Sequence, residues 1–371
     1  MIDMTKELQI IEAIRTLVRA EQPNQDISQL LLRHNCFYLL SKIKAINPYT
    51  QEYKQLHLLN SISIRQRFKS CAMLFRELNA LDIPYAVIKG AVLSQMAYGS
   101  PNHRRCGDID LLISRSYISP VKKLMKSHGF VQGRVTEKGV EPFSREEILF
   151  QTSMSHQVAP FIKETGASLC PYVNVDVNFN IMWGESEKKA DMDFVLKHTE
   201  PFSICSVMVR KLTPEAEFIS LCLHHYKDMN SIYLLAQGSL RLSLFCDIYY
   251  YVKNTQMDAE KLKTLCSQLE VTPYVYYCLH YTDVIFNDGV IRELFSKLLS
   301  VTNPSLPPVA SASTKAQYKV LLNQFGLTPS ERQTWTIDFY ERLFSSNLQT
   351  YFEEHLSHKL LNKIALNREF M

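Results

Sequence analysis

The chain has 371 residues, of which 46% are hydrophobic and 21% are charged, with a formal net charge of +4. This composition excludes a disordered or fibrous protein and predicts a soluble globular protein of two or three domains. The small net charge argues against a long nucleic-acid partner, and the nine scattered cysteines contain no C-x-x-C pair. No apolar run reaches the length of a membrane span and the N-terminus lacks a basic signal region, so we expect a cytoplasmic protein with no membrane partner.

Residues 1–80 predict an N-terminal helical region, because apolar residues recur there at spacings of three and four. Pro84 interrupts this pattern, and residues 81–212 predict a core of mixed strands and helices. Residues 213–371 predict a C-terminal helical domain, which opens at Thr213-Pro214 with the residue types of a helix start. Within this last region, 302–314 is rich in proline and serine and predicts an exposed linker.

The elements expected within the core follow from periodicity and turn residues. Strands are expected at 85–89, 108–113 and 203–212, and helices at 91–98 and 118–128. Two further strand-like runs, 153–162 and 170–183, flank the turn-like sequence KETGA and predict a hairpin.

Two carboxylates stand two residues apart in KGAVLSQMAYGSPNHRRCGDIDLLIS, which spans 89–114. Side chains alternate across a strand, so Asp108 and Asp110 point to the same side while Ile109 and Leu111 point to the other. Like charges held this close repel unless a cation lies between them, and Mg²⁺ characteristically binds one or two carboxylates together with substrate phosphates. The motif is also compatible with two solvated acids at the edge of a strand.

A third carboxylate lies in the strand-like sequence VNVDVNFNI, at 173–181. Its apolar residues occupy one face, and Asp176 is the single acid among the asparagines of the other face. If this strand lies beside 108–113, the three aspartates can hold two metal ions of the kind that assist phosphoryl chemistry. An amphipathic strand whose polar face meets water is the alternative.

The Lys89-Gly90 pair ends one expected strand and opens a helix. Such a turn lets backbone N–H groups approach a phosphate at the positive end of the helix, and Lys89 adds a point charge for the same oxygens. The pair is only two residues long, and the chain contains no G-x-x-x-x-G-K-[ST] phosphate-binding loop.

Together, VIKGAVLSQMAYGSPNHRRCGDIDLLIS and VNVDVNFNIMW resemble the DNA polymerase β-like nucleotidyltransferase superfamily, in its bacterial branch with a K-G turn and a D-I-D motif. The resemblance covers 82–183 and extends more loosely to 250. It implies an α+β fold, in which a polymerase-β-like core of mixed sheet and helices is flanked by N-terminal and C-terminal helical regions. Where the branch tends to have a histidine after the third acid, this chain has Asn178.

The resemblance also implies roles for individual residues. Asp108, Asp110 and Asp176 match the metal-binding and catalytic acids, and Asp176 would also act as the base. For the nucleotide, Lys89, Gly90 and Arg105 would steady the triphosphate. Lys227 is a candidate for the same pocket, together with His224 and His225 on one expected helix; a packed helix with a satisfied histidine is the alternative there.

The implied reaction moves an NMP from an NTP, with ATP among the candidates, to a hydroxyl or phosphate and releases pyrophosphate. Mg²⁺ or Mn²⁺ would be the cofactor, and the NTP would be the co-substrate. A small-molecule or peptide natural product is the acceptor that fits this branch best, which points to natural-product biosynthesis. Two alternatives stay open: a toxin-type nucleotidyltransferase that modifies tRNA or protein, and a catalytically idle nucleotide-binding module.

Overall fold

The computed structural model describes residues 4–183, 186, 189–230 and 241–298. Its N-terminal helices are α1 (Met4–Val18), α2 (Ser28–Arg33), α3 (Phe37–Leu40) and α4 (Pro48–Ala80). The central elements are β1 (Tyr85–Ile88), α5 (Gly90–Tyr98), β2 (Ile109–Ile113), a 3₁₀ turn (Arg115–Tyr117), α6 (Ile118–Ser127), β3 (Val131–Thr136), β4 (Gly139–Pro142), α7 (Arg145–Met154), β5 (Phe161–Ala167) and β6 (Cys170–Asn178). The remaining elements are α8 (Met192–Lys197), β7 (Thr199–Ile204), β8 (Val207–Leu212), α9 (Pro214–Asn230), α11 (Leu242–Asn254), α12 (Ala259–Gln268), α13 (Thr272–Phe286) and α14 (Val290–Leu298).

A six-stranded sheet forms the centre of the fold, in the order β1-β2-β6-β5-β3-β4. Strands β2 and β6 pair in parallel, whereas the other neighbours pair antiparallel, so the sheet is mixed. Strands β7 and β8 form a separate hairpin that lies against β1 and α4. This parallel pair places β2 and β6, the two strands with the expected metal-binding aspartates, side by side.

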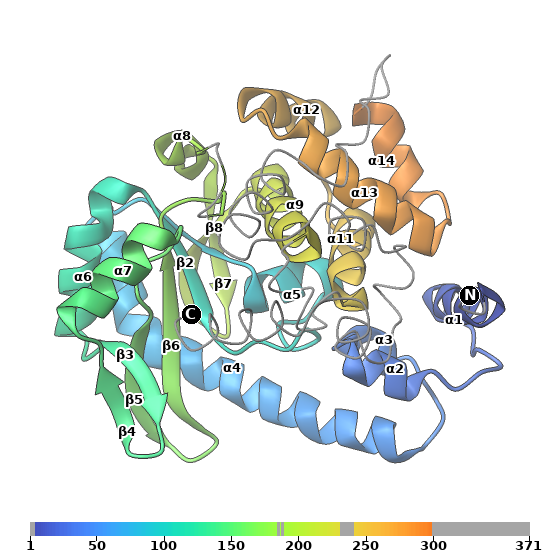
Figure 1. The fold of residues 1–371 in the computed structure, drawn as a ribbon, viewed down its shortest axis with the longest axis horizontal. Coiled ribbons are helices and arrows are strands. Elements are labelled where there is room, and N and C mark those ends of the chain that lie inside the picture. Colours follow the sequence, from blue (N-terminus) through green and yellow to red (C-terminus); the bar gives the residue numbers. More distant parts are fainter. Residues whose placement is uncertain (1–3, 184–185, 187–188, 231–240, 299–371) are drawn as a thin grey trace, which may run out of the picture.

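Helix α4 covers one face of the sheet and runs along the whole lower side of the molecule in Figure 1. Its N-cap residue is Asn47, which forms a capping box with Thr50, and Pro48 is the first residue of the helix. Its apolar stripe packs with α6 and the inward-facing residues of β1, β2 and β6 in one core cluster: Ile64, Phe68, Cys71, Leu74, Phe75, Leu78, Val121, Val173, Val175 and Val177 belong to it. This cluster fixes the register in which the opposite face of β2 and β6 is polar.

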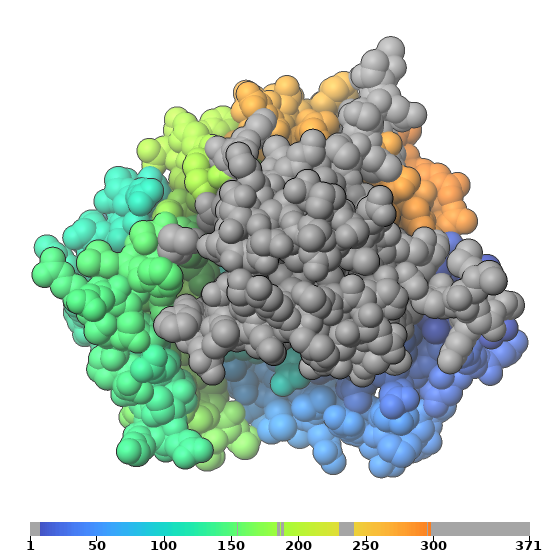
Figure 2. All heavy atoms as spheres, viewed as in Figure 1, coloured from blue at the N-terminus to red at the C-terminus, as the bar shows by residue number. Residues whose placement is uncertain are grey.

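A second core cluster lies on the other face of the sheet, and both the N-terminal and the last described helices contribute residues to it. Helices α1–α3 pack there with α5, α9, α11 and α13, and Figure 1 shows the N-terminal helices beside α11 and α13. Arg15 on α1 donates to the carbonyls of Ile285 and Val284, at 2.8 and 3.1 Å. Figure 2 shows the same view with all atoms: the blue N-terminal helices lie below and to the right, and the green α6–α7 region lies on the left.

The expected fold class is confirmed: the chain is α+β, with a mixed sheet flanked by helices on both sides in sequence. Within this frame several expected elements were wrong. A helix, α7, occupies the start of the run 153–162, and β5 passes through KETGA, so the hairpin turn falls at 168–169. The expected single strand at 203–212 is the hairpin β7–β8, and β3 and β4 were missed.

The domain boundaries at 80/81 and 212/213 stay predictions. The expected linker at 302–314 and the rest of the C-terminal region after 298 lie outside the described residues. Among the described helices, none combines the length and apolar character needed to cross a membrane.

Candidate active site

The Lys89-Gly90 turn joins β1 to α5 in an unusual backbone conformation. Lys89 has φ +56° and ψ −152°, a region that is almost confined to glycine, and Gly90 has φ +47°. A Cβ atom added at Gly90 would lie 3.0 Å from Cys106 Sγ, so the residue has little room for a side chain. The strain places the Lys89 side chain toward β2, where Nζ lies 3.2 Å from Asp110 Oδ1. Strained backbone of this kind is concentrated at functional sites.

The three expected aspartates lie on one face of β2 and β6. Asp110 is paired directly with Asp176 in the parallel register, and Asp108 precedes β2. Asp110 is 9% exposed. The clean alternation of β6 therefore produced the juxtaposition that the sequence predicted.

The carboxylates oppose one another electrostatically. Burial, followed by the charge of Asp110, raises the pKa of Asp108 above its ordinary value. Burial and then the charges of Asp108 and Asp110 raise the pKa of Asp176 to about 7, against the opposite effect of Lys89. Within the described chain, Lys89 is the one ion-pair partner of this group. The three acids therefore form a site with more negative charge than its protein surroundings compensate.

Asn178 occupies the position where the branch tends to have histidine. Its side chain is 1% exposed, and Nδ2 donates to Asp110 Oδ1 at 3.2 Å. Its Oδ1 atom is buried without a hydrogen-bond partner among the described residues. The asparagine therefore orients Asp110 and presents a free amide oxygen on the same face.

The donor atoms of this face suit a hard divalent cation, which prefers carboxylate and amide oxygens. A cation would also compensate the repulsion that raises the pKa of Asp176. In the described residues, however, no three His, Cys, Asp or Glu side chains are already gathered as a metal site. The chemistry of the donors fits Mg²⁺ or Mn²⁺.

A small pocket opens beside these strands, between the sheet and α9. Lys89, Lys227, His224 and Asn178 all line it. Its remaining wall is mostly apolar: Ile88, Ile181, Trp183 and Leu223, with His156, Asn180 and Ser220. An aromatic and aliphatic wall beside lysines can take a base and its phosphates.

Two lysines line the pocket, and each has an ion-pair partner: Lys89 Nζ lies 3.2 Å from Asp110 Oδ1, and Lys227 Nζ lies 3.4 Å from Asp228 Oδ1. Burial, then Lys227 and Lys89, lowers the pKa of His156 to about 3, and burial followed by Lys89 lowers the pKa of His224 well below its ordinary value. Both imidazoles are therefore neutral at pH 7, and the lysines carry the charge. The sequence-based expectation for Lys227 and His224 as pocket residues agrees with where the structure places them.

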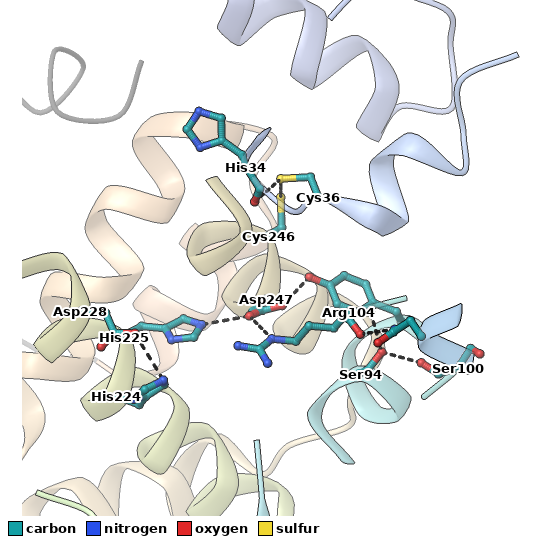
Figure 3. Close-up of polar contacts among 12 residues, drawn as sticks. His34, Cys36, Ser94, Ser100, Arg104, His224, His225, Asp228, Cys246 and Asp247 are labelled. Atoms are coloured by element: carbon teal, nitrogen blue, oxygen red, sulfur yellow. Dashed lines mark hydrogen bonds and ion pairs between the residues drawn. The ribbon is translucent and has the colours of Figure 1, made fainter. Parts of the chain in front are cut away.

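Arg105 and His225 lie elsewhere. Arg105 is exposed and lines a different cavity, together with residues of α2 and α4. His225 is fully buried and lies 3.2 Å from Asp247 Oδ2, turned away from His224, as Figure 3 shows. The positive charges that lower the pKa of Asp108, against burial and Asp110, are those of Lys89, Arg104 and Arg67.

Arg104 belongs to a buried polar cluster around Asp247 (Figure 3). Its Nε donates to Asp247 Oδ2 at 2.9 Å, and Tyr98 donates to Oδ1 at 2.6 Å. Burial opposes the charge of Asp247, yet Arg104 and His225 hold the pKa of this carboxyl below its ordinary value. The cluster ties α9 and α11 to α5 and to the segment 99–108 that leads into β2.

Sequence reasoning missed Arg104, Tyr98 and Asp247 as partners. One signal was available: Asp247 is the single acid within the apolar sequence LSLFCDIYYYV of α11. A lone carboxylate at a position that helical periodicity buries requires hydrogen-bonding partners. Which partners it finds, 143 and 149 residues away, depends on the tertiary fold.

Comparisons with known proteins complete the description. A family profile described as "Uncharacterised nucleotidyltransferase" matches residues 32–287, more than half of the chain. The search of curated proteins gives no match. Among solved structures, the chain is similar to an antigenic nucleotidyltransferase-like protein from Paracoccidioides brasiliensis, with 15% identity, a TM-score of 0.30, and coverage of 62% of this chain and 99% of that one. This structural likeness is too slight to bear on fold or function.

Proposed function

Because the chain belongs to the uncharacterised nucleotidyltransferase family, we propose that it transfers an NMP from an NTP to a small-molecule or peptide acceptor. The observation that carries the proposal is the pairing of Asp110 with Asp176 across β2 and β6, beside the strained Lys89 turn. An uncompensated group of carboxylates next to a lysine-lined pocket is what a metal–triphosphate substrate requires.

In the proposed reaction, an acceptor hydroxyl oxygen attacks the α-phosphorus of the NTP. The new P–O bond forms as the α–β phosphoanhydride bond breaks, and pyrophosphate leaves with the electron pair. Mg²⁺ or Mn²⁺, held by Asp108, Asp110 and Asp176, would neutralise phosphate charge. Asp176 takes the acceptor proton, and a bound divalent cation would keep its carboxyl ionised by lowering a pKa that is about 7 in the protein alone.

The pocket residues divide the remaining work. Lys89 and Lys227 contact phosphate oxygens, and the N–H groups at the start of α5 after Gly90 add to the same anion site. Trp183 and Leu223 provide an apolar surface for the nucleobase. Arg105 lies outside this pocket, so its expected triphosphate contact has no support from the geometry. Lys89, Arg104 and Arg67 supply the positive charge near Asp108.

The test is Asp176→Asn, measured by equilibrium NTP binding and by single-turnover pyrophosphate release with Mg²⁺. We expect binding to survive and the transfer rate to fall by about 10²-fold or more, because the base is lost. The double change Asp108→Asn with Asp110→Asn should abolish metal-dependent NTP binding as well. Binding that is equally tight in EDTA would overturn the metal role, and NTP binding without turnover by the wild type would favour an idle binding module.

A further inference from the structure

A second cavity, an open surface hollow of about 700 Å³, lies between α2, the start of α4 and the start of α11. Three arginines line it: Arg33, Arg105 and Arg241. Its walls otherwise consist of Leu30, Leu32, Leu56 and Tyr49, with the polar residues Gln29, Asn35 and Glu52. The cavity shares no lining residue with the lysine-lined pocket beside β2, so the two are separate.

The backbone holds two of these arginines side by side. His34, next to Arg33 and 5% exposed, accepts a hydrogen bond at Nδ1 from the N–H of Leu242, the residue after Arg241. This 3.0 Å bond ties the end of α2 to the start of α11. Both arginines also act on the titration of His34: burial and then the charges of Arg33 and Arg241 lower its pKa to about 3.

Hydrogen bonds to both of its chain neighbours hold the backbone of the third arginine, Arg105. Asn60 on α4 donates to the carbonyl of Arg104 at 2.8 Å and accepts from the N–H of Cys106 at 3.1 Å. These are the two chain neighbours of Arg105, so α4 holds the backbone at this residue. Three guanidinium groups are thus presented to the cavity from elements that direct hydrogen bonds position.

The charges at the cavity are unbalanced. Within the described part of the chain, no carboxylate forms an ion pair with Arg33, Arg105 or Arg241, and Glu52 is the one acid in the lining. All three arginines are exposed to solvent, so a ligand can reach them. Arginine recognises phosphate by paired N–H donors, and three arginines around one hollow with a single acid favour an anionic ligand. The leucines and Tyr49 add an apolar floor.

We propose that this cavity is a second ligand site, which binds a small molecule that carries a phosphate ester beside an apolar group. The three guanidinium groups hold the phosphate, and the leucine and tyrosine floor takes the apolar part. The site does not depend on the proposed transferase chemistry, because neither the metal nor the β2–β6 carboxylates take part. A ligand held by Arg105 also contacts the segment that carries Arg104 and Asp108.

Phenyl phosphate is a suitable probe, titrated into the full chain by calorimetry in EDTA. We expect the wild type to bind it, and Arg105→Gln to weaken binding by about tenfold, because a charged bidentate contact is lost. Arg105→Lys keeps the charge without the planar fork, so we expect an intermediate affinity. Glu52→Gln should tighten binding by about threefold, since it removes the one opposing charge. Benzyl alcohol, which lacks the phosphate, should not bind.

Two variants serve as controls. Arg76→Gln removes an exposed arginine of α4 that does not line the cavity, and it should bind as the wild type does. Lys89→Gln changes the other pocket and should also leave phenyl phosphate binding unchanged. The proposal is overturned if the wild type shows no binding at about 10 mM probe, if Arg105→Gln matches the wild type, or if Lys89→Gln is the variant that loses binding.

Discussion

The carboxylate of Asp247 and those at the β2–β6 face are both withdrawn from water, yet their pKa values move in opposite directions. Asp247 has Tyr98, Arg104 and His225 as partners, and its pKa is lowered. Asp176 faces two further aspartates, and its pKa rises to about 7. Burial is common to both sites, so the difference comes from the partners.

This contrast separates a structural carboxylate from one reserved for a ligand. The cluster around Asp247 is satisfied within the protein and fixes α11 against α5. At the β2–β6 face Lys89 offsets the repulsion only in part, which costs stability in the metal-free fold and which an added cation would relieve. The same substitution, aspartate to asparagine, is therefore expected to change the free energy of unfolding in opposite directions at the two sites.

The largest effect is expected from Asp247→Asn. Asparagine cannot compensate the buried Arg104 guanidinium, so we expect the free energy of unfolding to fall by about 3–5 kcal/mol. Asp176→Asn, in metal-free protein, should leave it unchanged or raise it, because like charges are removed. Urea unfolding in EDTA measures both. Glu293→Gln, which breaks the exposed Glu293–Lys297 pair, is the control and should leave the free energy of unfolding nearly unchanged. Equal losses at Asp247 and Asp176 would refute the contrast.

Two glutamates of helix α9, neither with an expected role in catalysis, show the same contrast between an unpaired and a paired carboxylate. Glu217 is 2% exposed, neither of its carboxyl oxygens has a hydrogen-bond partner among the described residues, and burial raises its pKa to about 8. Glu215 is buried too, but the Lys261 side chain and the Asp258 N–H contact it at 2.8 and 2.9 Å. Against the effect of burial, these contacts lower the pKa of Glu215.

The next prediction uses this pair to test how pH acts on stability. A folded-state pKa above the unfolded one means that the folded protein binds the proton more tightly. The Glu217 contribution is therefore present below about pH 4.5 and is lost as pH rises toward 8, on the order of 3 kcal/mol. Glu217→Gln should remove this loss, which urea unfolding from pH 5 to 8.5 would show as a flatter profile.

Glu215→Gln is the matched control for this titration. Its folded-state pKa is lowered, so its contribution is present above the unfolded pKa and is lost as pH falls. The variant should therefore be less stable than the wild type at pH 8, where Glu217→Gln is more stable. A gain in stability at pH 8 from both variants would mean that burial alone, and not pairing, governs these carboxyls.

Sequence patterns predicted the parts of the site that depend on local periodicity. Alternation predicted one face for Asp108 and Asp110, and a polar face for Asp176, but it left open whether the two strands are neighbours, which the β2–β6 pairing decides. The Lys89-Gly90 turn was visible as a strand end before a helix. Periodicity does not distinguish a helix from a strand in a short run that is compatible with both. The run 153–162 was predicted as a strand, but its first two residues are the end of α7.

Long-range partners could not be predicted in the same way. Arg104 and Arg105 are adjacent in sequence, and the resemblance favoured Arg105 for the triphosphate. The structure turns Arg104 to Asp247 and Arg105 to the second cavity. The direction of each side chain depends on how Asn60 fixes the segment on α4, which is a tertiary contact. A family motif identifies such an arginine by its position in the sequence, whereas the packing decides which group its side chain faces.

The smallest predicted effect concerns the strained turn at Lys89, where the side chain is expected to bind the nucleotide and the backbone conformation is expected to lower the stability of the fold. Lys89→Gln and Lys89→Gly both remove the ammonium group beside Asp110, so both should weaken metal–NTP binding to the same extent. Only glycine relaxes the backbone at φ +56°. We therefore expect Lys89→Gly to be more stable to urea than Lys89→Gln by about 1 kcal/mol, after the greater freedom of glycine in the unfolded chain offsets part of the relief. Equal stability of the two variants would show that the conformation carries no strain, and tighter NTP binding by Lys89→Gly than by Lys89→Gln would show that the backbone, and not the ammonium group, limits access of the phosphates.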